Sequence, residues 1–208
     1  MKRNISAAAL TRLAALIAIL LVMTYVPGLG YIPVGAFSIT LMMLPVGVAA
    51  VIIGPVGGAV MGTLFGLTSF LQCVGVGIPA VGLKLFFFSV NPFLTFIWCV
   101  IPRFLAGWLP GLIFAAMSRS KLPKTVSAVV ACGLGSAFNT IFYMFTLWAL
   151  FGRTDKVIET YGSSNFFKIL LAVVVTNTLL ELAVNTFIGG AVSRTLLKFL
   201  PARRKSKA

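Results

Sequence analysis

The chain has 208 residues, of which 60% are hydrophobic and 10% are charged, and its mean hydropathy is +1.08. Three acidic and 17 basic residues cannot form the polar shell that a water-soluble domain of this length needs. Apolar stretches of about 20 residues recur along the chain, which is the length of helix that crosses a hydrocarbon core. We therefore expect an all-α integral membrane protein.

The net charge of +14 does not indicate nucleic-acid binding, because the basic residues gather at the ends of apolar stretches. The basic run over 199–208 is typical of a cytoplasmic tail that faces anionic lipid. The chain has no histidine, and its three cysteines are scattered through apolar segments. We expect no metal site and no thiol chemistry.

The apolar pattern predicts six transmembrane helices in one membrane domain over 1–208. In chain order they cover about 9–26, 36–53, 56–73, 92–117, 124–151 and 165–197. The first begins after basic residues, as a signal peptide would, but lacks a small-residue cleavage site and is expected to stay as a membrane helix. Gly54-Pro55 predicts a tight turn between the second and third helices. A stretch with Gly and Pro, about 74–91, connects the third helix to the fourth.

Basic residues set the predicted orientation, since they favour the cytoplasmic side of a membrane. With six helices and both termini inside, 12 basic residues fall on the cytoplasmic side and four fall outside. The four are Lys84, Arg153, Lys156 and Lys168. An odd number of helices would separate the two basic termini and lose this asymmetry. We therefore expect cytoplasmic N and C termini.

Two stripes of small residues predict close helix packing, because association in lipid depends on backbones that approach closely. The third helix carries Gly58, Gly62 and Gly66 at intervals of four. The first helix carries a similar strip of Thr11, Ala14 or Ala15, and Ala18. This strip is compatible either with packing inside the protein or with docking of a partner's helices.

Three polar residues fall near the middle of the membrane. Arg103 lies roughly 11 residues, or about 16 Å, into its helix, and Asn139 and Glu181 lie at similar depths in theirs. A charge at this depth costs on the order of 3 kcal/mol, so it is usually paired or functional. Two interpretations remain open and can coexist: Arg103 and Glu181 neutralise each other, or they contact a ligand.

Further polar residues share faces with these three. The last helix places Asn177, Glu181 and Asn185 four apart, and a face that polar is not expected to contact lipid. These polar faces predict a small polar cavity between the last three helices. Together with Lys84 on an outer loop, Arg103 makes this cavity electropositive, which favours a substrate with a carboxylate or phosphate. The candidate substrate-binding residues are Tyr31, Lys84, Asn91, Arg103, Asn139, Tyr143, Asn177, Glu181 and Asn185.

Catalysis is not expected. The chain has no histidine, no paired carboxylates close in sequence and no zinc-binding helix motif. It also has no P-loop, so it is not expected to hydrolyse ATP by itself. We expect no cofactor.

Several motifs resemble those of the substrate-binding S-components of energy-coupling factor (ECF) vitamin transporters. They are Gly30-Tyr-Ile-Pro-Val-Gly-Ala-Phe-Ser-Ile-Thr40, Leu44-Pro45-Val46, Gly54-Pro55-x-x-Gly58-Ala59-x-x-Gly62-x-x-Phe65-Gly66-Leu67-x-Ser69, Ile101-Pro102-Arg103-x-x-x-Gly107 and Asn177-x-x-x-Glu181-x-x-x-Asn185. The number of helices, the inside termini and the Ala-rich first helix also fit, so the resemblance covers nearly the whole chain.

The resemblance implies a bacterial plasma-membrane protein that captures a vitamin from outside. It implies three partners, a transmembrane coupling subunit and two ATPases, with Thr11, Ala14, Ala15 and Ala18 facing the coupling subunit. It also implies a pocket in the outer half of the membrane, formed by the last three helices and the loops after the first and third. Pantothenate-type members are most similar, while folate, riboflavin and pyridoxine members share the architecture. A self-sufficient secondary transporter is the alternative, although no internal repeat supports it.

Overall fold

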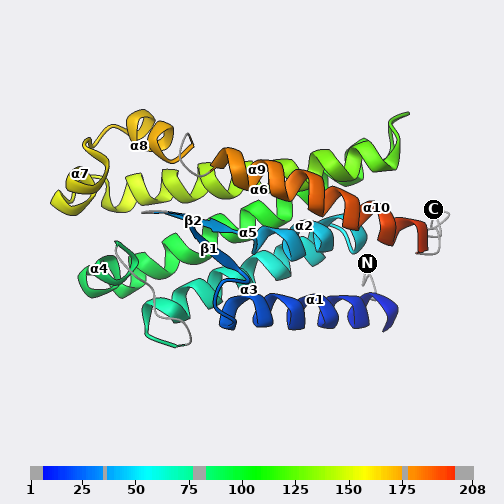
Figure 1. The fold of residues 1–208 in the computed structure, drawn as a ribbon, viewed down its shortest axis with the longest axis horizontal. Helices are drawn as coiled ribbons and strands as arrows, with labels where there is room; N and C mark the ends of the chain where they lie inside the picture. Colours follow the sequence, from blue (N-terminus) through cyan, green and yellow to red (C-terminus); the bar gives the residue numbers. More distant parts are fainter. Residues whose placement is uncertain (1–6, 35–36, 77–82, 175–177, 200–208) are drawn as a thin grey trace, which may run out of the picture.

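The computed structural model describes residues 7–34, 37–76, 83–174 and 178–199. Within them the chain is helical apart from one two-stranded sheet, and its long helices lie side by side (Figure 1). Four of these helices are long and apolar enough to cross a membrane: α1 (Ala7–Tyr25), α3 (Pro55–Cys73), α5 (Pro92–Met117) and α6 (Lys124–Phe151). The helical class is confirmed, and six spans remain a prediction.

The second predicted helix is wrong in its first part. Instead of helix from residue 36, the structure has a β-hairpin of β1 (Tyr31–Val34) and β2 (Phe37–Thr40), in which Tyr31 lies opposite Thr40. Aromatic and β-branched residues in both segments favour strand over helix. The helix itself, α2 (Met43–Ile52), has 10 residues, almost all of them buried. At about 15 Å it crosses only half of a hydrocarbon core.

The turn between α2 and α3 is confirmed. Gly54 adopts a φ of 102°, which side chains other than glycine's rarely tolerate, and Pro55 occupies the start of α3. The turn brings α3 back beside α2, and both helices also contact α5.

The glycine stripe of α3 packs against α5, as a close-packing motif predicts. A Cβ atom on Gly58 would meet the carbonyl oxygen of Gly107, and a Cβ atom on Gly62 would meet that of Arg103. A Cβ atom on Gly66 would lie 2.7 Å from the Cα atom of Val100. The two backbones are therefore in direct contact over about two helical turns, and this contact fixes where Arg103 leaves α5.

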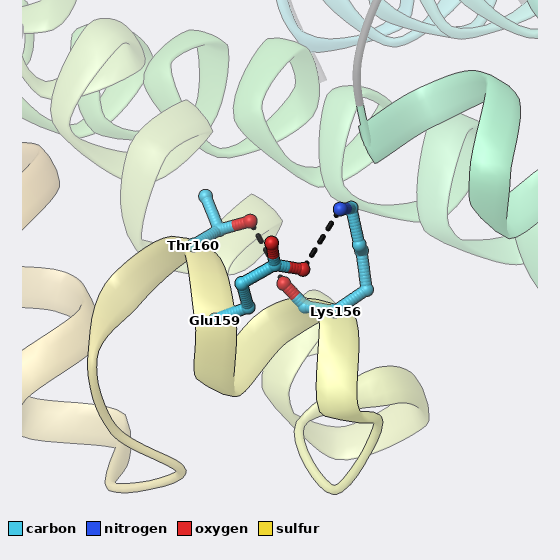
Figure 2. Close-up of polar contacts among 3 residues, drawn as sticks. All are labelled: Lys156, Glu159 and Thr160. Atoms are coloured by element: carbon cyan, nitrogen blue, oxygen red, sulfur yellow. Dashed lines mark hydrogen bonds and ion pairs between the residues drawn. The ribbon is translucent and has the colours of Figure 1, made fainter.

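Two short helices lie at the same end of the bundle (Figure 1). The stretch 74–91, expected to be a connection, contains α4 (Leu83–Val90), whose buried Phe87 stacks on Phe151 with ring centroids 4.3 Å apart. The loop after α6 contains α7 (Asp155–Tyr161), where Lys156 and Glu159 form an exposed ion pair of 2.8 Å (Figure 2). An exposed pair of this kind adds little stability.

The described parts of the final predicted helix, 165–197, are helical from Phe166 onward. They are α8 (Phe166–Val173), α9 (Leu179–Val184), the π-helical turn η2 (Asn185–Gly189) and α10 (Gly190–Phe199). Short π-helical turns are frequent at functional sites. The start of α1 and the end of α10 lie at the same end of the bundle, opposite α4 and α7 (Figure 1).

Gly62→Ala should lower the stability of the folded protein. The added methyl group meets the backbone of α5, so the helices must separate, and we expect a cost of roughly 1–3 kcal/mol. Thermal unfolding of the purified protein in detergent measures it. Val56→Ala is the control, since this α3 side chain is 58% exposed; equal melting temperatures for the two variants would contradict the packing argument.

Candidate functional site

Arg103 is buried in the middle of α5, and the proline before it leaves one backbone carbonyl oxygen able to accept a hydrogen bond from its side chain. Because Pro102 has no N–H, the carbonyl oxygen of Trp98, four residues earlier, loses its usual helical donor. Nη1 of Arg103 donates to this oxygen at 2.9 Å. Among the described residues, Nε of Arg103 has no hydrogen-bond partner. The guanidinium is thus held at one nitrogen and has donor capacity left for a ligand.

Aromatic rings surround the same guanidinium. Its carbon lies 3.8 Å from the centroid of the Tyr143 ring and 5.5 Å from that of Phe65, within the range of cation–π attraction. The Tyr143 ring in turn stacks on Trp98, with centroids 4.6 Å apart. Nε1 of Trp98 donates to the Tyr143 carbonyl oxygen at 3.2 Å, which joins α5 to α6.

Glu181, on α9, is the buried acid of the site. Its Oε1 accepts a hydrogen bond of 2.7 Å from the backbone N–H of Thr40, at the end of β2. Tyr31 lies opposite Thr40 in the hairpin, and its buried hydroxyl is within electrostatic reach of both Arg103 and Glu181. The hairpin therefore brings Tyr31 to the two buried charges.

Two asparagines add polar atoms from neighbouring helices. Nδ2 of Asn185, in η2, donates to the Ser136 hydroxyl at 3.2 Å and to the Glu181 carbonyl oxygen at 2.8 Å. The Oδ1 atoms of Asn185 and Asn139 are buried and find no donor among the residues that the structure describes. Buried acceptors normally have a partner, so these oxygens are available to a ligand.

Three of the predicted site residues are not placed beside Arg103 and Glu181 by the described structure. The Oδ1 atom of Asn91 accepts from the N–H of Leu94 at 3.1 Å and caps the start of α5. Lys84 belongs to α4, but its side chain lies outside the described part of the structure, and Asn177 lies outside the described residues altogether. A role in ligand binding stays a prediction for all three.

The structure adds three groups that sequence reasoning missed: Trp98, Phe65 and the backbone N–H of Thr40. Phe65 lies between Gly62 and Gly66 on the helix that packs against α5, so the glycine spacing could have predicted that it lies near Arg103. The position of Pro102, four residues after Trp98, could have predicted that the Trp98 carbonyl oxygen lacks a helical donor. The role of the Thr40 N–H could not be predicted, because the apolar pattern did not indicate the β-hairpin that places it.

The small-residue strip of α1 lies on the outside of the molecule. Thr11, Ala14, Ala15 and Ala18 are all exposed, whereas Leu16 and Leu20 of the same helix are buried. Internal packing of the strip, one of the two predicted alternatives, is therefore wrong. Docking of a partner remains a prediction.

The chemistry of the centre suits recognition of a small polar molecule. It combines a guanidinium with spare donor capacity, stacked rings and two acceptor oxygens, contributed by α5, α6 and η2. Within the described residues, no group of three or more potential metal ligands is found. Hydrogen-bond donors, acceptors and aromatic rings of this kind are groups that bind a ligand.

Tyr143→Leu should destabilise the protein more than Tyr143→Phe. The Phe ring keeps both the stacking on Trp98 and the cation–π contact with Arg103, while Leu removes them and leaves a buried charge without its neighbour. We expect a difference of about 1–2 kcal/mol between the two variants. Denaturation of the ligand-free protein measures it, and equal stabilities would exclude the ring as a support of Arg103.

Comparisons with known proteins show which family the chain resembles over most of its length. The pantothenate transporter PanT of Leuconostoc mesenteroides is 28% identical over 188 residues, which cover 86% of this chain and 87% of that protein. The pantothenic acid transporter PanT of Lactococcus lactis subsp. cremoris is 30% identical over 165 residues, or 76% and 78% of the two chains. The model of the family described as ECF transporter, substrate-specific component, matches residues 8–190. The chain therefore belongs to the family of ECF transporter substrate-specific components, which are multi-pass proteins of the plasma membrane.

Proposed function

We propose that this protein captures pantothenate outside the cell and is the substrate-specific part of an ATP-driven importer. The two relatives named above are transporters of this vitamin by name, and their similarity extends over most of both chains. The observation that carries the proposal is the buried Arg103 guanidinium, which lies on the Tyr143 ring and has an Nε atom without a described partner.

The chemistry of pantothenate matches this centre. The vitamin carries a carboxylate at one end and two hydroxyl groups and an amide along the rest. A carboxylate is a strong acceptor for a guanidinium, which binds it in a planar, directional way. The hydroxyl and amide donors suit the Oδ1 atoms of Asn139 and Asn185. Tyr31 and Tyr143 would then enclose the apolar parts of the vitamin.

Transport requires partners that this chain does not supply. We propose six membrane crossings with both termini in the cytoplasm, since 12 of the 17 basic residues then lie inside. In this arrangement the end of the bundle with α4 and α7 faces outward, where the vitamin enters. A transmembrane coupling subunit and two ATPases would provide the energy, with the α1 strip as the docking face.

Two alternatives lead to different experimental results. Substrate-specific components for folate, riboflavin or pyridoxine share the architecture, and a binding screen against all four vitamins separates them from the proposed one. A self-sufficient secondary transporter would take up substrate in cells that lack the coupling subunit. Membership of a transporter family supports the expectation that the chain is not an enzyme.

The purified protein should bind pantothenate, and Arg103→Ala should weaken binding by roughly 10- to 150-fold, because a charge-assisted hydrogen bond contributes about 1.5–3 kcal/mol. Arg103→Lys keeps the charge but not the planar fork, so we expect a loss of about tenfold. Isothermal titration calorimetry measures both.

The matched control is Arg119→Ala, which removes an exposed arginine from the turn just after the same helix. It should leave the affinity unchanged. The melting temperature of each variant shows whether it is folded. A folded Arg103→Ala variant with wild-type affinity would remove Arg103 from the site, and failure of the wild-type protein to bind pantothenate would refute the substrate assignment.

Ala14→Leu and Ala18→Leu should spare pantothenate binding and impair its uptake. Both residues are exposed on α1, away from the site, and a larger side chain there prevents close approach of a partner's helix. Uptake of labelled pantothenate by cells that carry the coupling subunit and ATPases measures the effect, with Val22→Leu as the control on the same helix. Normal uptake by both alanine variants would exclude this strip as the docking face.

A further inference from the structure

Glu181 differs from the other two acidic residues of the chain in what surrounds it. Asp155 and Glu159 are exposed on α7, whereas the Glu181 side chain is 3% exposed and lies in the centre of the bundle. Its Oε1 atom receives the backbone N–H of Thr40 at 2.7 Å. A carboxylate buried this deeply is expected to serve a defined partner, and here that partner belongs to the hairpin.

The geometry of the hairpin explains why Thr40 needs this acceptor. The N–H of Leu41 donates back to the carbonyl oxygen of Gly30, at 2.9 Å, so the N–H of Thr40 points away from β1. It therefore lies on the open edge of β2, which pairs with no other strand among the residues that the structure describes. An edge N–H buried inside a membrane protein is costly without an acceptor, and Glu181 provides one.

The same contact determines where Tyr31 lies. Tyr31 and Thr40 are opposite each other in the hairpin, so an anchor at Thr40 also fixes the backbone of Tyr31. Two strands alone are only marginally stable, which makes an external anchor effective. We therefore expect the hairpin to be held less firmly against α9 when this hydrogen bond is lost.

We propose that Glu181 is a positioning residue, which anchors the β1–β2 hairpin through the Thr40 N–H and so holds Tyr31 at the binding site. This inference rests on the proposed function for its consequence in binding. It assigns Glu181 a role as hydrogen-bond acceptor instead of direct contact with the substrate. A carboxylate in contact with an anionic vitamin would repel it, whereas one that is engaged by a backbone N–H helps to organise the site.

Three substitutions separate the acceptor role from a role of the charge. Glu181→Gln keeps the length and an acceptor oxygen but removes the charge. Glu181→Asp keeps the charge but is one methylene group too short to reach Thr40. Glu181→Ala removes both. Glu159→Ala is the matched control, because it removes the exposed glutamate of the Lys156 ion pair.

The first measurement is hydrogen exchange of the backbone amides over 31–42 in the full-length, ligand-free protein. We expect exchange to accelerate about tenfold or more in the Ala and Asp variants, since a buried N–H has lost its acceptor. The Gln variant and the Glu159→Ala control should stay close to wild type. Unchanged protection in the Asp variant, or lost protection in the Gln variant, would overturn the proposal. If the Ala variant does not fold, the exchange rates of the Gln and Asp variants are sufficient to test the proposal.

The second measurement is the affinity for pantothenate. The Ala and Asp variants should bind about tenfold more weakly, and the Gln variant should bind at least as tightly as wild type. A Gln variant that loses binding while its hairpin stays protected would show that the charge contacts the substrate, against the proposal. If the wild-type protein does not bind pantothenate, the proposed function fails, but the exchange measurement still tests the anchor.

Discussion

Direct contact between the backbones of α3 and α5 determines where the polar centre of this membrane protein lies. Lipid provides no hydrophobic drive for helix association, so close packing and hydrogen bonds must hold the bundle together. The glycines of α3 leave no side chain between the helices, and Gly62 lies against the carbonyl of Arg103 itself. With one face of α5 occupied in this way, the Arg103 side chain extends to α6, where Tyr143 receives it.

The partners that the structure describes for Arg103 are neutral: a carbonyl oxygen and two aromatic rings. A carboxylate partner would cancel the charge, whereas these groups stabilise the guanidinium and leave most of its attraction for anions intact. Pro102 is essential to this arrangement, because it frees the Trp98 carbonyl that a regular helix would use. The hydrogen bond that Pro102 removes from α5 thus leaves a carbonyl oxygen that stabilises the buried Arg103 guanidinium without neutralising its charge.

Apolar length and glycine spacing were sufficient to predict the four long helices and the contact between α3 and α5, because both depend on residues close in sequence. The hairpin was missed because β1 fell in the predicted connection before residue 36, while β2 is as apolar as the start of a membrane helix. Only the β-branched and aromatic character of these residues favours strands. The depth of Arg103, Asn139 and Glu181 was predictable from helix geometry. The partner of Glu181 was not, since it is a backbone atom whose position depends on tertiary contacts 141 residues apart.

The polar centre and the proposed docking strip use different parts of the bundle. α1 packs on α2 and α3 through Leu16 and Leu20, and its small residues face outward. The polar groups come from α5, α6, α9, η2 and the hairpin, and the hairpin is connected to α1 by only a few residues. The hairpin is therefore the shortest covalent path between the two regions. The Thr40 N–H that donates to Glu181 lies opposite Tyr31 in this hairpin, so the same short segment joins the buried acid to the connection that leads to α1.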